Sequence, residues 1–178
     1  MPNTVPTPAP SIEALMNYEA QIEHALVETL VTDGLPAFAP RGCTVLPDTH
    51  VAVTCDVEAA DGLALTNNRN PDSIEFVRQQ GTVTFAISTK RPRLAPASPI
   101  EYFAGVRERH ESFIGRIRAT MLYRSRPFTA GNLPWYAVSH IRQTGLAREV
   151  EGQDGIDVTT LTYEIEFTIR DEAWPVAS

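Results

Sequence analysis

Apolar side chains recur at helical spacing near the start of the chain. The apolar positions lie three or four residues apart, at Leu15, Tyr18, Ile22, Leu26 and Leu30. Ser11 is suited to cap the helix that this spacing predicts, and Asp33-Gly34 is a typical stop signal. Residues 1–10 contain four prolines and predict a flexible arm outside the domain.

Alternation of apolar and polar residues predicts the strands. Every second residue is apolar in residues 51–57, 83–87 and 161–169, as expected for strands with one face in a core. Residues 135–142 form a further predicted strand, and the glycines and acidic residues of 149–157 predict the loop of a hairpin. A long, mobile loop is predicted at 59–72, because that segment is rich in turn formers.

A second helix is predicted to begin at Pro99. Ser98-Pro99-Ile100-Glu101 combines a capping box with proline at the first helical position. The stripe expected to face inward is Phe103, Val106, His110, Phe113, Ile117 and Met121. The residues expected to face outward are Arg107, Glu108, Glu111 and Arg118. Pro127 prevents the helix from continuing.

The order helix, strand, strand, helix, strand, strand favours an α+β fold. We expect one domain, residues 11–178, in which an antiparallel sheet of about four strands is covered by two helices. The chain has 178 residues, of which 43% are apolar, and this is ordinary for a single domain. No apolar run approaches the ~18 residues that a transmembrane helix needs.

Charge is distributed unevenly along the chain. The formal net charge of −7 argues against bulk binding of nucleic acid, because phosphate contacts depend on lysine and arginine. The first 33 residues hold five acidic residues and no lysine or arginine, residues 90–126 hold nine basic residues against three glutamates, and residues 149–172 are acidic again. Such blocks either balance within the fold or form complementary faces between subunits, in which case Arg107 and Arg118 are interface residues.

The cysteines and one nearby histidine are the main candidates for chemistry. Cys43, His50 and Cys55 lie close in sequence and leave open a small cysteine-dependent enzyme. Cys55 occupies a core position of a strand, however, and Cys43 follows a glycine in a turn, so that both fit structural roles. A chain with only two cysteines favours synthesis in a reducing, intracellular compartment.

No other motif predicts an active site. His110-Glu111 begins like a zinc-protease helix, but Ile114 stands where the second histidine is required. His110 is therefore expected to be a hydrogen-bonded core residue. The chain has no phosphate-binding glycine-rich loop and no nucleophile elbow. We predict no catalytic residue, no cofactor and no metal site.

An irregular connection follows the second predicted helix. It mixes aromatic side chains with arginines, including Arg124, Arg126, Phe128 and Trp135. Aromatic residues and arginine dominate the binding energy of many interfaces, so these four residues are candidate contacts with another subunit. The alternative is an ordinary packed connection.

The arrangement of elements resembles the tail terminator proteins of long-tailed bacteriophages. The likeness lies in the acidic first helix, the strand pair with an extended loop, the helix that opens at Ser98 and the closing hairpin. The hairpin carries it most clearly, with WYAVSHI at 135–141, an acidic loop, LTYEIEFTI at 161–169 and a final Trp174-Pro175. The likeness spans about Ser11 to Pro175.

The resemblance implies a structural protein of the virion tail or neck, made in the host cytoplasm. Such proteins form a hexameric ring on the last ring of the tail tube, stop tube growth and provide the surface onto which the head docks. The implied partners are further copies of the chain, the tail tube protein and neck or connector proteins. DNA passes through the ring without specific binding, and no membrane is involved. A head-tail connector or stopper is the second hypothesis, and the cysteine-dependent enzyme is the third.

Overall fold

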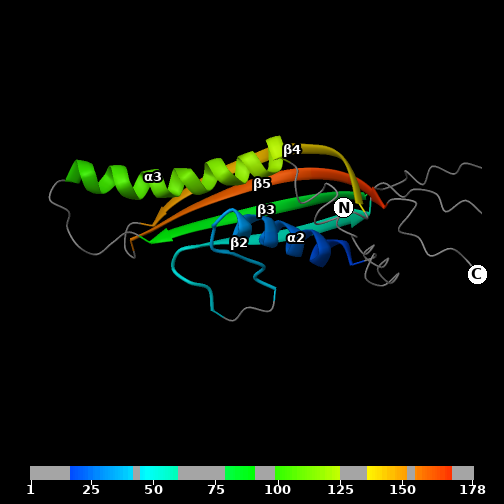
Figure 1. Cartoon of the computed structure of the whole chain (residues 1–178), viewed down its shortest axis with the longest axis horizontal. Coiled ribbons are helices and arrows are strands. Elements are labelled where there is room, and N and C mark those ends of the chain that lie inside the picture. Colours follow the sequence, from blue (N-terminus) through cyan, green and yellow to red (C-terminus); the bar gives the residue numbers. More distant parts are fainter. Residues whose placement is uncertain are drawn as a thin grey trace, which may run out of the picture.

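Two α-helices lie over one face of a five-stranded sheet (Figure 1). The structure is a computed structural model, and it describes residues 17–41, 45–59, 79–90, 99–124, 136–151 and 155–169. The elements in chain order are α2 (Tyr18–Thr32), β1 (Ala37–Phe38), β2 (His50–Ala59), β3 (Gln79–Lys90), α3 (Pro99–Arg118), the π-helical η1 (Ala119–Arg124), β4 (Tyr136–Glu151) and β5 (Ile156–Ile169). The α+β fold class is therefore confirmed.

The strand order across the sheet is β1-β2-β3-β5-β4. The predicted antiparallel pairing of β2 with β3 and of β4 with β5 is confirmed, and β5 also pairs antiparallel with β3. The expected four-stranded antiparallel sheet is corrected by β1, which pairs parallel with β2 through Ala37 and Val51. A strand of two residues is too short to show an alternating pattern, and for this reason the sequence did not predict it.

The inward residues of the strands follow the predicted alternation. Val51, Val53 and Cys55 of β2 are fully buried, and the corresponding positions of β3 and β5 are equally buried, at Val83, Phe85, Ile87, Leu161, Tyr163, Ile165 and Phe167. Two positions depart from the pattern, because Ala52 of β2 and Ser88 of β3 belong to the other face of the sheet and are nevertheless buried.

The helices cover this face with their apolar sides. α2 buries Ile22, Leu26 and Leu30, as predicted, and its predicted start at Ser11 lies outside the described residues. Asp33 and Gly34 end the helix as expected: Gly34 has a φ of 81°, and the Leu35 N–H donates back to the Leu30 carbonyl at 2.9 Å. Such a left-handed residue after the last turn is the common glycine stop of a helix.

α3 begins at Pro99 as predicted, and its first turns project beyond the ends of the strands (Figure 1). The described part of the predicted inner stripe is buried, at His110, Phe113, Ile117 and Met121, while the side chains of Phe103 and Val106 lie outside the described residues. The α-helical turns end at Arg118 and give way to the π-helical turn of η1, well before Pro127.

The closing hairpin is longer than expected. β4 extends to Glu151 instead of ending near residue 142, and the turn before β5 contains Gly155 with a φ of 67°. Two register shifts interrupt its pairing with β5, between Val138 and His140 and between Gln143 and Gly145. The predicted long loop at 59–72 lies outside the described residues beyond Ala59.

Candidate assembly surfaces

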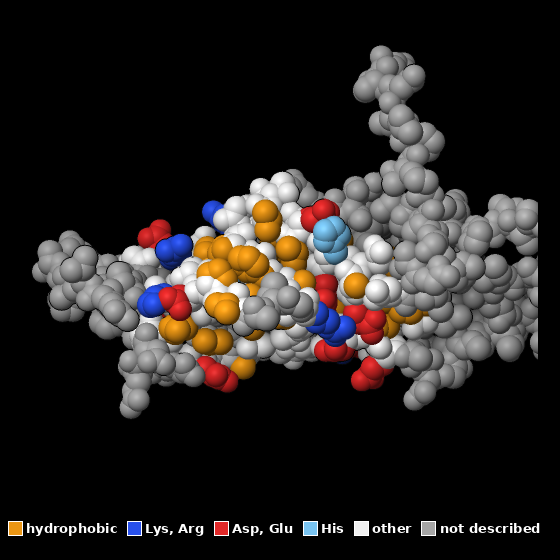
Figure 2. All heavy atoms as spheres, turned by 90° about the horizontal axis from the view of Figure 1, so that it is seen from below, with side chains coloured by type: hydrophobic (Ala, Val, Ile, Leu, Met, Phe, Trp, Pro, Cys, Tyr) orange, Lys and Arg blue, Asp and Glu red, His pale blue; other side chains and the backbone are white. Residues whose placement is uncertain are grey.

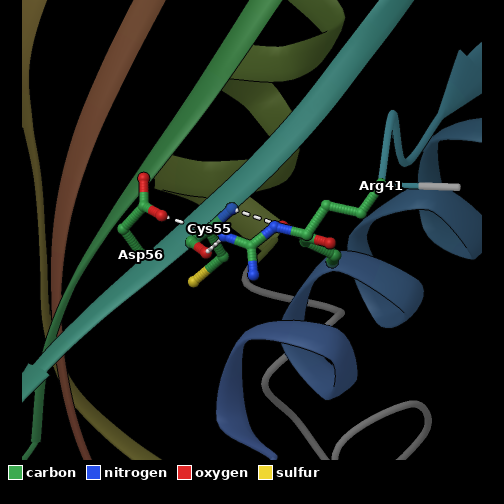
Figure 3. A network of polar contacts seen from close by, with 4 residues as sticks. Arg41, Cys55 and Asp56 are labelled. Carbon is green, nitrogen blue, oxygen red and sulfur yellow. Dashed lines mark hydrogen bonds and ion pairs between the residues drawn. The ribbon is translucent and has the colours of Figure 1, made fainter.

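A buried carboxylate joins α2 to β2. Glu23 is 3% exposed, and one of its carboxylate oxygens accepts the backbone N–H of Cys55 at 2.8 Å. Arg41 approaches the same oxygen through Nε at 3.3 Å. Its Nη2 donates to the Cys55 carbonyl at 2.8 Å and to the Asp56 carboxylate at 2.9 Å (Figure 3). The charge of Glu23 is thus compensated where water is excluded, as a buried carboxylate requires.

These contacts also close part of the sheet edge. Cys55 bonds to side chains through both of its backbone polar groups, which face away from β3. At the start of the same strand, the Val51 N–H donates to the Pro36 carbonyl at 2.9 Å, next to β1. The outer edge of β2 is therefore occupied at these positions and cannot accept a further strand there.

The Cys55 thiol is a packing group in this structure. Its side chain is fully buried beneath α2, and burial together with the nearby Glu23 carboxylate raises the pKa of the thiol far above its ordinary value. His50 lies five residues earlier on the same strand, so its side chain belongs to the opposite face of the sheet. Cys55 and His50 therefore form no thiolate-imidazole pair, and Cys43 lies outside the described residues.

His110 is held between two threonine hydroxyls. Its Nδ1 lies 2.8 Å from the Thr89 Oγ1 on β3, and its Nε2 lies 2.8 Å from the Thr159 Oγ1 on β5. Burial lowers the pKa of His110, although Asp157 and Glu111 oppose this shift. The prediction of a hydrogen-bonded core histidine is confirmed, and the contacts fix α3 to two strands at once.

The face of the sheet opposite the helices is polar and carries small side chains. Thr54, Thr84 and Thr162 are direct neighbours across three strands. In a nearby row, the Glu164 carboxylate accepts hydrogen bonds from Arg142 at 2.6 Å and from Gln80 at 2.5 Å. The Arg142 guanidinium holds the pKa of the Glu164 carboxyl below its ordinary value. This carboxylate therefore belongs to an ion pair of the solvent-facing sheet.

The predicted interface residues lie in different settings. Arg107 is exposed on α3, as expected. Arg118 is half-buried, and its Nε donates to the Gln143 Oε1 of β4 at 3.3 Å, so its expected outward position is wrong. It follows directly after the buried Ile117 and thus sits at the margin of the inner stripe, over the edge of the sheet.

The remaining predicted contacts lie outside the described residues. Arg124 is the last residue of η1, and its side chain is not described. Arg126, Phe128 and Trp135 belong to the connection between η1 and β4 and lie entirely outside the described ranges. Their assignment to an interface stays a prediction.

Exposed aliphatic side chains gather at the two opposite edges of the sheet. Val31 at the end of α2 is 53% exposed and Val45, between β1 and β2, is 84% exposed. On the β4 edge, Leu146 and Leu122 of η1 are each 47% exposed. Figure 2 views the side that carries α2 and β2 and shows hydrophobic side chains gathered there, with charged side chains around them. Each edge thus presents two exposed aliphatic side chains.

Sequence reasoning missed these four aliphatic residues and the Glu23 network. A signal for Glu23 was present, because it precedes Leu26 by three residues and Leu30 by seven and therefore shares the buried side of the helix. The sequence contains no comparable signal that Val45 and Leu146 are exposed, because both are single apolar residues whose surroundings depend on how β1 and β4 are placed.

No family model matches the chain, and no curated protein matches its sequence. The described residues bring together no group of three or more His, Cys, Asp or Glu side chains that could hold a metal ion. Neither described helix is both long and apolar enough to cross a membrane.

Proposed function

We propose that this chain is a structural virion protein that assembles into a ring, as the tail terminators of long-tailed phages do. In this proposal a homohexameric ring sits on the last ring of the tail tube, stops its growth and offers the head a docking surface. Its partners are further copies of the chain, the tail tube protein below and neck or connector proteins above. DNA passes through the ring without specific binding.

The observation that carries the proposal is the pair of unlike apolar edges. Val31 and Val45 lie at the β1 edge, and Leu122 and Leu146 lie at the β4 edge. A two-fold dimer joins the same patch of both subunits, whereas two different patches on opposite sides favour head-to-tail contacts. Head-to-tail contacts generate a closed ring when the rotation between neighbours closes.

Two of the side chains considered for chemistry support a structural role, whereas Cys43 lies outside the described residues. The Cys55 thiol packs in the core, and His110 is engaged by Thr89 and Thr159. Both side chains are used to hold elements together, which weighs against the cysteine-dependent enzyme. A connector or stopper would also form a ring, so the position of the protein within the virion is the finer part of the proposal.

The test of the proposal is the mass of the purified chain, measured by native mass spectrometry and compared with images from negative-stain electron microscopy. We expect one closed species of six subunits that appears as a ring. Added to polymerising tail tube protein, it should end tube growth and label one tube end. A chain that stays monomeric at every concentration would overturn the proposal, and rings that never bind tubes would favour the connector.

A further inference from the structure

The exposed side of α2 is acidic and ends in an aliphatic residue. His24, Glu28 and Val31 lie three or four residues apart and share one side of the helix. The side chains of His24 and Glu28 are 74% and 55% exposed and pair with each other at 3.2 Å, and Val31 is 53% exposed. α2 has no lysine or arginine, and of its three glutamates Glu28 is exposed, Glu19 is half-buried and Glu23 is buried.

The exposed side of α3 has the opposite charge. Arg107, Arg109 and Arg116 are exposed along the helix, against Glu108 alone among the exposed acidic residues described there. Within the subunit, Arg116 donates to the Asp33 carbonyl at 2.8 Å and Arg109 lies over the Phe113 ring, so Arg107 is the arginine for which no such contact is described. The helix leads into η1, where Leu122 is 47% exposed. Each helix therefore offers exposed charges of one prevailing sign followed by an exposed aliphatic side chain.

The outer side of α3 also leaves room for a close neighbour. Gly115 is exposed, and a Cβ built there would meet nothing within 4 Å. Glycine in a helix interior is less stable than alanine by about 1 kcal/mol, and no contact with the described part of the chain explains it here. Ser112, one turn earlier, is exposed and also small. Small side chains allow two helix axes to approach within the usual 8–10 Å.

We infer that the exposed side of α3 in one copy packs against the exposed side of α2 in the next copy of this chain. This inference rests on the proposed ring and names the surfaces that would join it. The second copy fits as occupant because its acidic helix complements the arginines of α3 and because its Val31 offers apolar surface to Leu122. In the proposed ring this contact joins two different surfaces, α3 of one copy and α2 of the next, and therefore runs head to tail.

The first experiment blocks each surface separately. Gly115→Gln fills the space on α3 with a good helix former, and Val31→Gln removes the aliphatic contact on α2. We expect each variant alone to need at least about tenfold more protein to assemble, a change that corresponds to about 1.4 kcal/mol. An equal mixture should form a dimer, because one intact surface remains on each variant. Gln80→Ala, on the open face of the sheet, is the control and should assemble normally.

The second experiment exchanges the charges. Glu28→Arg and Arg107→Glu should each lower the oligomer fraction, and the chain that carries both changes should recover it, because opposite charges again meet between copies. Circular dichroism and urea denaturation of the monomers check that every variant folds.

The two proposals fail in different ways. A wild-type chain that never assembles overturns both the ring and this contact. A wild-type ring that is unaffected by Gly115→Gln and by Val31→Gln overturns the contact alone and leaves the proposed function standing. Loss of assembly in both variants without dimer formation in the mixture also overturns the head-to-tail contact.

Discussion

Glu23 holds a helix and a strand together, because its carboxylate serves the Cys55 N–H and Arg41 at once. Replacing it by alanine leaves a buried N–H without its acceptor, and such a loss costs about 1–3 kcal/mol. We therefore expect Glu23→Ala to lower the free energy of unfolding by that amount in urea denaturation. Glu23→Gln keeps one acceptor oxygen and should cost less.

Glu28 provides the matched control for this prediction. It lies on the same helix, but its side chain is 55% exposed and pairs with the exposed His24. Exposed pairs of this kind contribute about 0–1 kcal/mol, so Glu28→Ala should change the stability little. Equal effects of the two alanine variants would show that the buried network contributes nothing of its own.

His110 makes the stability of the subunit depend on pH. Burial lowers its pKa in the folded state from the ordinary value near 6.5, so the unfolded chain binds the proton more readily. The stability that this histidine contributes is therefore complete above pH 6.5 and is lost as the pH falls towards the lowered folded value. Asp157 on β5 and Glu111 on α3 favour the charged form and reduce the effect, and Arg148 on β4 adds to it.

The comparison variant is His110→Gln, which keeps hydrogen-bonding groups near Thr89 and Thr159 but does not titrate. We expect the free energy of unfolding to fall between pH 7 and pH 5 more steeply for the native chain than for this variant. The other three histidines are present in both chains, so their contributions cancel in the difference. Parallel pH profiles would refute the prediction.

At the scale of the elements, two glycines should respond to the same substitution with opposite signs. Gly34 ends α2 with a φ of 81°, a left-handed conformation that costs other residues about 1–2 kcal/mol. Gly115 lies inside α3 with open space around its Cα. Under monomeric conditions, Gly34→Ala should destabilise the subunit by about 1 kcal/mol, and Gly115→Ala should stabilise it by about 0.5–1 kcal/mol.

Gly34→Asn separates the conformational effect from the loss of glycine in general. Asparagine tolerates the left-handed region better than alanine does, so this variant should lie between the native chain and Gly34→Ala in urea denaturation. A destabilising effect of Gly115→Ala in the monomer would mean that the space beside α3 is used within the subunit.

The elements with strong periodicity were predictable, and the features that depend on tertiary placement were not. α2 and the alternation of β2, β3 and β5 follow from spacing, because hydrophobic burial imposes it, and the start of α3 at Pro99 follows from its capping box and proline. β1 is too short for a pattern, and the place of β5 between β3 and β4 depends on long-range pairing. The inward turn of Arg118 was missed because a residue at the margin of a helix stripe can face either way.

At the scale of the whole molecule, the uneven charge predicts an assembly that is sensitive to salt. The exposed side of α3 is basic and that of α2 is acidic, and charges separated by more than a Debye length of about 8–10 Å are screened at ordinary ionic strength. We expect the oligomer fraction, measured by sedimentation, to fall as salt is raised. Arg107→Glu should lower it further while the circular dichroism of the monomer stays unchanged.

If the oligomer fraction changes neither with salt nor with Arg107→Glu, charge pairing does not hold the subunits together. Apolar contacts at Val31, Val45, Leu122 and Leu146 would then hold the subunits together, and the charge blocks would balance within each chain. Replacing Leu146 by asparagine should in that case dissociate the assembly at every salt concentration.

The closed edge of β2 limits how these sheets can associate with one another. Fibres grow when every sheet offers hydrogen-bonding groups at both edges, since each added chain then creates a new place for the next. Here Glu23 and Arg41 occupy the outer groups of Cys55, and β1 covers the start of the same strand, whereas β4 is the long outer strand among the described residues. At these positions backbone pairing with a further sheet is blocked, so edge-to-edge growth through this part of β2 is prevented.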